Sequence, residues 1–135
     1  MTELIPLSPF ADIPGRSWSA PPLCSNEYDS DTLEPLIRYL ECSPMILPWM
    51  ECTEDLIGGK FKVLGGSAIM SDGKYFWRYE AGEYLKHYPI RVPDEAIAHF
   101  RSRHWNPPEF TSAEIAELER VLTSMFEYLH ELESI

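Results

Sequence analysis

The side chains able to bind a metal ion or to act as nucleophiles are three cysteines and four histidines. Zinc sites use closely spaced pairs such as Cys-x-x-Cys or His-x-x-x-His, and the chain contains neither pair. His99 and His104 lie five residues apart, which places them on different faces of a helix. Cys42 and Cys52 each follow a glutamate, and a carboxylate disfavours the thiolate that a nucleophile needs. With no Gly-x-Ser-x-Gly motif either, the sequence predicts no metal, no cofactor and no enzymatic activity.

Carboxylates are the most abundant reactive groups, with 22 Asp and Glu against 11 Lys and Arg and a net charge of −11. Between Glu27 and Asp55 the only Lys or Arg is Arg38. Carboxylates in loops can pair with Arg and Lys of another protein through charge-assisted hydrogen bonds. We therefore predict that the chain binds a basic protein, without turnover, through six carboxylates. These are Glu51, Glu54 and Asp55, followed by Glu27, Asp29 and Asp31.

The charge is unevenly distributed along the chain. Residues 1–60 carry ten acidic and three basic side chains (−7), residues 61–109 carry six and seven (+1), and residues 110–135 carry six and one (−5). Two acidic ends that flank a neutral centre repel nucleic acids and anionic membranes and attract basic partners. The alternative interpretation is that the acidity only maintains solubility.

Length and composition indicate one globular domain. A chain of 135 residues that is 44% hydrophobic can bury a core without disulfides or metals. No apolar run approaches the ~18–20 residues that span a bilayer, and the N-terminal residues lack the basic start and long apolar stretch of a secretory signal. Three widely spaced cysteines do not match a disulfide framework. We expect a cytoplasmic protein without membrane association, and its oligomeric state stays open.

The elements that position these groups are organised around residues 67–100. Asp72-Gly73 lies between two apolar runs and predicts a β-hairpin with a type I′ turn, in which both turn residues have positive φ. Gly65-Gly66 predicts a second tight turn just before it. Together the two turns predict a three-stranded antiparallel meander over residues 60–79. Residues 45–47 precede a proline and are a candidate edge strand.

Four helices are expected from apolar periodicity and end signals: residues 32–42, 80–88, 93–104 and 112–132. The last is the best specified, because Thr111 to Glu114 match a capping box and apolar residues follow at three- and four-residue steps as far as Leu129 and Leu132. Residues 1–30 contain five prolines and no helical period, and predict an extended arm. The expected fold is α+β: a meander packed against four helices in a single domain, residues 31–135, preceded by the arm.

Aromatic residues are concentrated in the central segment, where they are either core or a partner-facing patch. Alternation along a strand places Tyr75 and Trp77 on one face and Phe76 on the other. We expect Trp77, Tyr84 and Tyr88 to belong to the core.

One pattern resembles a known family. Asp72-Gly73 followed by Trp77, then Tyr84 and Tyr88 four residues apart, then two alternating apolar residues before Pro93, is similar to small bacterial proteins encoded beside polymorphic toxins and regarded as immunity proteins. The resemblance covers about residues 65–100, and Asp94-Glu95-Ala96 departs from the Glu-Phe that often follows the proline in that family.

The resemblance implies a protein that binds and neutralises a cognate toxin. Toxin domains that attack nucleic acid tend to be basic, and complementary charge accelerates their association with an acidic inhibitor. The runner-up is a cytoplasmic adaptor or chaperone-like protein-binding module, and a stand-alone enzyme is third. The resemblance locates no binding site.

Overall fold

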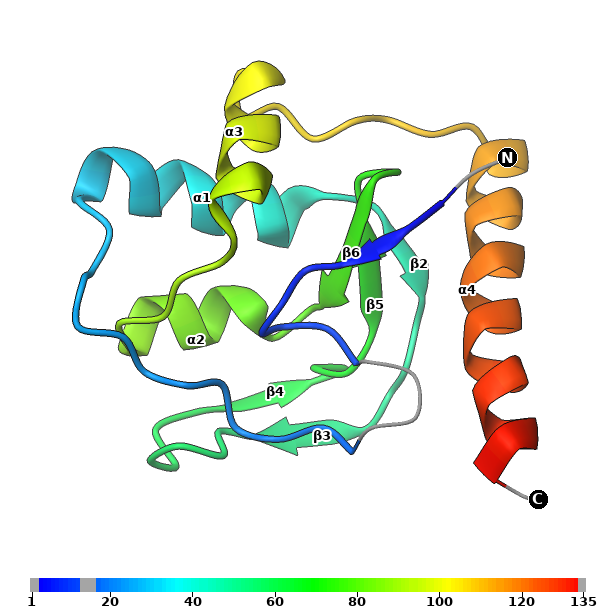
Figure 1. Ribbon diagram of the computed structural model, residues 1–135, viewed down its shortest axis with the longest axis horizontal. Helices are drawn as coiled ribbons and strands as arrows, with labels where there is room; N and C mark the ends of the chain where they lie inside the picture. The colour runs from blue at the N-terminus through cyan, green and yellow to red at the C-terminus, as the bar shows by residue number, and fades with distance from the viewer. Residues whose placement is uncertain (1–2, 13–16, 134–135) are drawn as a thin grey trace.

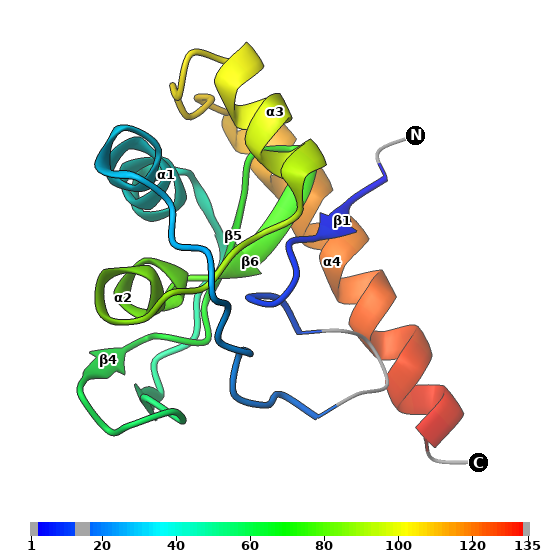
Figure 2. The ribbon, with the colours of Figure 1, turned by 60° about the vertical axis from the view of Figure 1, so that its left-hand side comes forward.

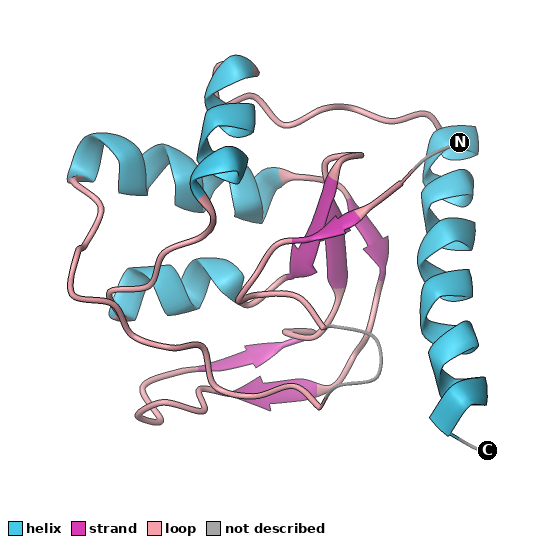
Figure 3. Ribbon diagram, viewed as in Figure 1, coloured by secondary structure: helices cyan, strands magenta, loops and turns pink. Residues whose placement is uncertain are grey.

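The computed structural model describes residues 3–12 and 17–133, with side chains up to residue 126. These residues form one small α+β domain (Figures 1 and 3). Its elements in chain order are β1 Ile5–Pro6, α1 Ser30–Cys42, β2 Met45–Leu47, β3 Cys52–Glu54, β4 Lys62–Leu64, β5 Ile69–Ser71, β6 Tyr75–Arg78, α2 Ala81–His87, α3 Asp94–Ser102 and α4 Ser112–Glu133. All four predicted helices are confirmed, with ends within two residues of those expected. None of the described helices is long and apolar enough to cross a membrane.

A four-stranded sheet forms the centre of the fold, in the order β1-β6-β5-β2. β5 and β6 are the predicted hairpin, β2 is the predicted edge strand and pairs antiparallel with β5, and β1 pairs parallel with β6. Figure 2 shows α1, α2 and α3 on one side of this sheet and α4 on the other. The sheet therefore buries both of its faces.

The larger core lies between the sheet and the first three helices. Trp77 is fully buried there and donates its indole N–H to the carbonyl oxygen of Leu40 at 3.0 Å. Its ring packs at 6.2–6.3 Å from those of Tyr39 and Phe100. The expectation of a core position is confirmed for Trp77 and for Tyr84, whereas Tyr88 is only partly buried.

The second core lies on the opposite face of the sheet. Phe76 points away from Trp77, as alternation predicts, and packs with Ile46 and Ile69 against Leu118 and Leu122 of α4. The predicted capping box of α4 is present: the Thr111 amide donates to Glu114 Oε1 at 3.0 Å, and the Glu114 amide donates to Thr111 Oγ1 at 3.2 Å. The predicted apolar positions Leu129 and Leu132 lie outside the described side chains.

The predicted meander is wrong in its first pairing, because β4 pairs with β3 in a separate two-stranded sheet. Two local features explain this. A turn organised by Asp55 closes β3 and β4 into a hairpin of their own, and β2 occupies the edge of β5 that β4 would have used. Gly65, at φ +75°, then leads the chain from one sheet to the other rather than back on itself.

The hairpin turn after β5 also differs from the prediction. Positive φ falls on Gly73 alone (+91°) and not on Asp72, so the turn is not type I′. The buried Asp72 carboxylate instead accepts the backbone amides of Lys74 and Tyr75 at 3.0 and 2.8 Å. It also accepts the Tyr39 hydroxyl at 2.6 Å and lies 3.1 Å from His99 Nε2. Asp72 thus joins the turn to α1 and α3.

Residues 3–12 of the predicted N-terminal arm pack against the domain, whereas most of residues 17–29 are exposed. β1 extends the sheet, and Leu4, Leu7 and Phe10 are buried in the two cores. Proline content misleads here because an edge strand tolerates a proline on its unpaired side.

Candidate functional site

The two-stranded sheet, which we call the ribbon (residues 49–65), is the element that carries the first three predicted carboxylates. Its strands pair Cys52 with Leu64, Thr53 with Val63 and Glu54 with Lys62. The first and last of these pairs are exposed, whereas Thr53 and Val63 are partly buried. The ribbon therefore has an outer face open to solvent and an inner face that packs on the domain.

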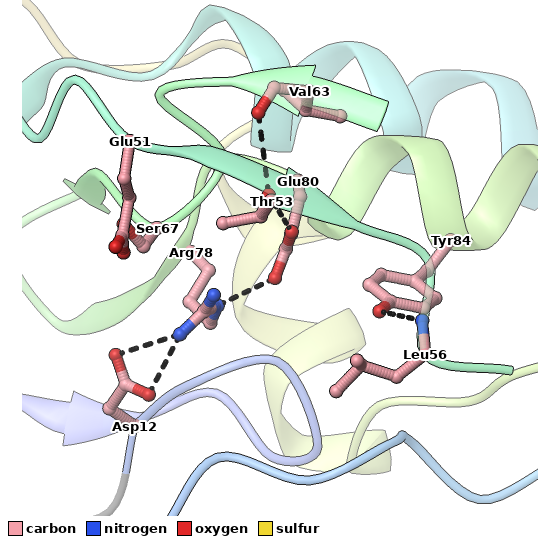
Figure 4. A network of polar contacts seen from close by, with 9 residues as sticks. All are labelled: Asp12, Glu51, Thr53, Leu56, Val63, Ser67, Arg78, Glu80 and Tyr84. Atoms are coloured by element: carbon pink, nitrogen blue, oxygen red, sulfur yellow. Dashed lines mark hydrogen bonds and ion pairs between the residues drawn. The ribbon is translucent and has the colours of Figure 1, made fainter. Parts of the chain in front are cut away.

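The inner face is fixed by a buried chain of polar contacts (Figure 4). The Thr53 hydroxyl donates to Glu80 Oε2, and Glu80 Oε1 accepts Arg78 Nε at 2.7 Å. Arg78 Nη1 then donates to Asp12 at 3.0 Å, and the Trp18 ring lies 4.2 Å from the guanidinium carbon. The side chains of Arg78 and Glu80 are 8% and 1% exposed. A buried ion pair gains little in net stability, but each partner requires the other, so this chain of contacts holds ribbon, sheet and N-terminal segment in one arrangement.

Close backbone packing reinforces the base of the ribbon. The Gly65 amide donates to the Glu51 carbonyl oxygen at 2.8 Å, and a Cβ at Gly65 would lie only 2.9 Å from the carbonyl oxygen of Trp49. A Cβ at Gly66 would overlap the Thr53 hydroxyl. Both glycines are therefore required where the ribbon meets the domain.

Asp55, predicted to face a partner, instead organises the tip of the ribbon. Its side chain is buried and accepts the backbone amides of Ile57 and Lys60, each at 2.8 Å, and the hydroxyl of Tyr88. Burial would raise the pKa of Asp55, but the hydrogen bonds from Tyr88 and from the backbone hold it below its usual range. Burial and the neighbouring Asp55 carboxylate together raise the pKa of Tyr88 to about 12. Asp55 is therefore a structural residue rather than a contact for a partner.

The ribbon tip is also bound to α2 through Tyr84. The Leu56 amide donates to the Tyr84 hydroxyl oxygen at 3.1 Å, and burial raises the pKa of that tyrosine. With Tyr88 holding Asp55, two tyrosines of the predicted aromatic cluster position the ribbon. Their role is thus structural, through hydroxyl groups as well as rings.

Glu51 and Glu54 remain on the exposed surface of the ribbon. Glu51 accepts the hydroxyl of the buried Ser67, and Glu54 lies 3.3 Å from Lys62 in an exposed pair. The exposed Glu54–Lys62 pair contributes little to stability, ~0–1 kcal/mol, so Glu54 can exchange Lys62 for a partner's Arg or Lys. Glu51 holds Ser67 through Oε1 alone, and its charge can still pair with a partner's Arg or Lys. Glu54 nevertheless has a basic neighbour, Lys62, which strand pairing brings close and which the sequence did not predict.

The second group of predicted carboxylates lies elsewhere. Asp29 is the N-cap of α1, where Oδ1 accepts the Thr32 amide at 2.9 Å, and Glu27 and Asp31 are exposed nearby. A groove between α1 and α3 is lined by Glu27 and Asp29 together with Arg91 and Arg101, so these acids do have basic neighbours. Figure 1 places the start of α1 far from the ribbon. The structure therefore does not bring the six carboxylates into one site.

Sequence reasoning missed the exposed apolar residues at the base of the ribbon. Trp49, Met50 and Leu64 are 52%, 77% and 66% exposed. The available signal was a Trp-Met pair between Pro48 and Glu51, outside any periodic element that would bury it. Exposed apolar groups gathered in one place are a common mark of interaction surfaces.

The described residues hold no cluster of three or more His, Cys, Asp or Glu side chains that could bind a metal ion. Cys24, Cys42 and Cys52 are free thiols. The ribbon presents exposed carboxylates and apolar side chains on a rigid support. Comparison with protein-family models, curated proteins and solved structures finds no match to this chain.

Proposed function

We propose that the protein is an inhibitor of the immunity type, which binds a basic toxin domain in the cytoplasm and neutralises it without catalysis. The observation that carries this proposal is the ribbon: a rigidly supported element on which Glu51, Glu54 and several apolar side chains are exposed. A support that is ordered before binding reduces the entropic cost of association. The net charge of −11 adds long-range attraction to a basic surface.

The carboxylates have different roles in this proposal. Glu51 and Glu54 are exposed and form the principal charged contacts, and Asp55 holds the turn that closes the ribbon beside Glu54. Glu27 and Asp31 are exposed on a separate surface and contribute mainly to the overall field, while Asp29 caps α1. Exposed charges at the rim of an interface change the association rate and its salt dependence more than the dissociation rate.

The test is co-expression with the product of the neighbouring gene, which this proposal expects to contain a basic toxin domain. The wild type is expected to restore growth to cells that produce that domain and to copurify with it as a stable complex. The Glu51→Gln/Glu54→Gln variant is expected to lower the association rate, and the Glu109→Gln/Glu119→Gln variant, which alters exposed acids just before and within α4, is the charge-matched control. The proposal is overturned if the wild type fails both to restore growth and to copurify with that domain.

An adaptor or chaperone-like module is the second candidate, favoured by the exposed apolar residues, which do not require a basic partner. It is distinguished by the same experiment. An adaptor would form a complex without suppressing toxicity, whereas an inhibitor does both.

A further inference from the structure

The base of the ribbon brings three exposed apolar side chains together from two segments. Leu64 pairs across the ribbon with Cys52, and the Gly65 amide bonds to Glu51, next to Met50. Trp49 also lies here, because its carbonyl oxygen is close to Gly65. The backbones of residues 49–52 and 64–65 thus run side by side at the base of the ribbon. We call the three exposed residues that they carry, Trp49, Met50 and Leu64, the apolar patch.

The apolar patch stands on a constrained part of the ribbon. The next pair along the strands, Thr53 and Val63, faces inward, and Thr53 is bonded to the buried Glu80. Glu51, beside the patch, bonds to the buried Ser67. These contacts fix the backbone beneath the exposed side chains. A single exposed leucine on a protein surface requires no explanation, but here three large apolar residues are exposed on one support. A large aromatic residue on a rigid support is a frequent centre of binding energy in protein interfaces.

Charge decides what kind of surface covers the patch. Each copy of the chain carries −11, so two copies that meet at this face repel one another at low salt. Glu51 borders the patch with a negative charge that its contact with Ser67 does not neutralise, whereas Glu54 in the next exposed pair is balanced by Lys62. A partner with an apolar centre and surrounding Lys or Arg satisfies both the patch and its border.

We infer that Trp49, Met50 and Leu64 are the anchor of a protein interface, which receives an apolar side chain flanked by Lys or Arg from a basic partner protein. This deepens and rests on the proposed function. In this arrangement the apolar patch sets the dissociation rate, and Glu51 at the rim sets the association rate.

The test uses a phage-displayed library of random 12-residue peptides, selected on the intact protein at low salt. The peptides are expected to carry an aromatic or aliphatic residue bracketed by Lys or Arg. Their affinity is expected to fall at least tenfold for Trp49→Ala and for Leu64→Ser, mainly through faster dissociation. Glu51→Gln is expected to slow association and flatten its salt dependence. Leu23→Ala is the matched control, because Leu23 is 56% exposed on the N-terminal segment beside Pro89, and it should leave binding unchanged.

Peptides that bind Trp49→Ala and Leu64→Ser as tightly as the wild type would overturn the inference, as would a selection without enrichment or one enriched in acidic peptides. Sedimentation of the wild type as a dimer that Leu64→Ser dissociates would overturn it too, in favour of a second copy. Thermal unfolding of each variant, expected within a few degrees of the wild type, shows that the exposed substitutions leave the fold intact. The peptide result and growth rescue can be told apart. If the patch binds basic peptides but the protein does not neutralise the toxin, the proposed function alone is rejected. If Trp49→Ala and Leu64→Ser neutralise the toxin as well as the wild type does, the anchor alone is rejected.

Discussion

Replacing Glu80 with Gln tests whether the buried chain of polar contacts supports the ribbon. The side chain is 1% exposed and accepts both Arg78 Nε at 2.7 Å and the Thr53 hydroxyl. Glutamine keeps one acceptor oxygen, but its amide nitrogen then faces a donor, either the Thr53 hydroxyl or Arg78 Nε. Removing one partner of a buried ion pair costs ~3–5 kcal/mol. Because Asp12 still compensates Arg78 at 3.0 Å, we expect the lower end, about 3 kcal/mol.

Urea unfolding followed by circular dichroism measures this loss. At a slope of ~1.5 kcal/mol/M, a loss of about 3 kcal/mol lowers the midpoint by about 2 M. Glu83→Gln is the matched control, because Glu83 is 33% exposed and its partner Lys86 keeps Glu41 at 2.6 Å. The control should lose less than ~1 kcal/mol. A double-mutant cycle of Glu80→Gln with Thr53→Val should show coupling. A loss under ~1 kcal/mol for Glu80→Gln, or additivity in the cycle, would refute the structural role of this network.

Three further predictions follow from burial and hydrogen bonding. Trp77→Ala should lose ~3–5 kcal/mol in urea unfolding, since the ring is fully buried; a loss under ~1 kcal/mol would contradict a core position. The pKa of Asp55 is lowered in the folded state, so its contribution to stability is present above its unfolded pKa of ~3.9 and is lost as the pH falls below that value. The stability gap between the wild type and Asp55→Asn should narrow from pH 7 to pH 3, and the pKa of Tyr88 should fall from about 12 in the variant; a gap independent of pH would oppose this. Replacing all three free thiols with serine should preserve fold and binding, and a folded variant that no longer binds would reopen a role for them.

The helices and the β5–β6 hairpin could be predicted because their signals are local. The capping box at Thr111 and the apolar steps after it are contained in one element, and Asp72-Gly73 marks the turn even though its φ angles differ from those expected. The pairing of β3 with β4 was missed because its turn depends on Asp55. In sequence, that carboxylate is indistinguishable from its exposed neighbour Glu54.

The candidate site was predictable only in part. Glu51 and Glu54 are exposed, as expected for contacts, but strand pairing supplies Glu54 with Lys62 from eight residues away. Burial of Asp55 depends on Tyr88 from α2, 33 residues later. The apolar patch was missed for a similar reason: the sequence contains Trp49 and Leu64, but only the fold shows that they are neighbours and exposed.

The most direct measurement of the central claim is the affinity for the basic partner domain at two ionic strengths, compared between the wild type and Glu51→Gln/Glu54→Gln. Both carboxylates are exposed, so the variant should fold normally, and Asp55 is left intact because it holds the loop. We predict weaker binding by the variant at low salt and a smaller loss of affinity as salt increases. Equal affinity and an equal salt dependence for the two proteins would contradict the assignment of the ribbon as the acidic interface.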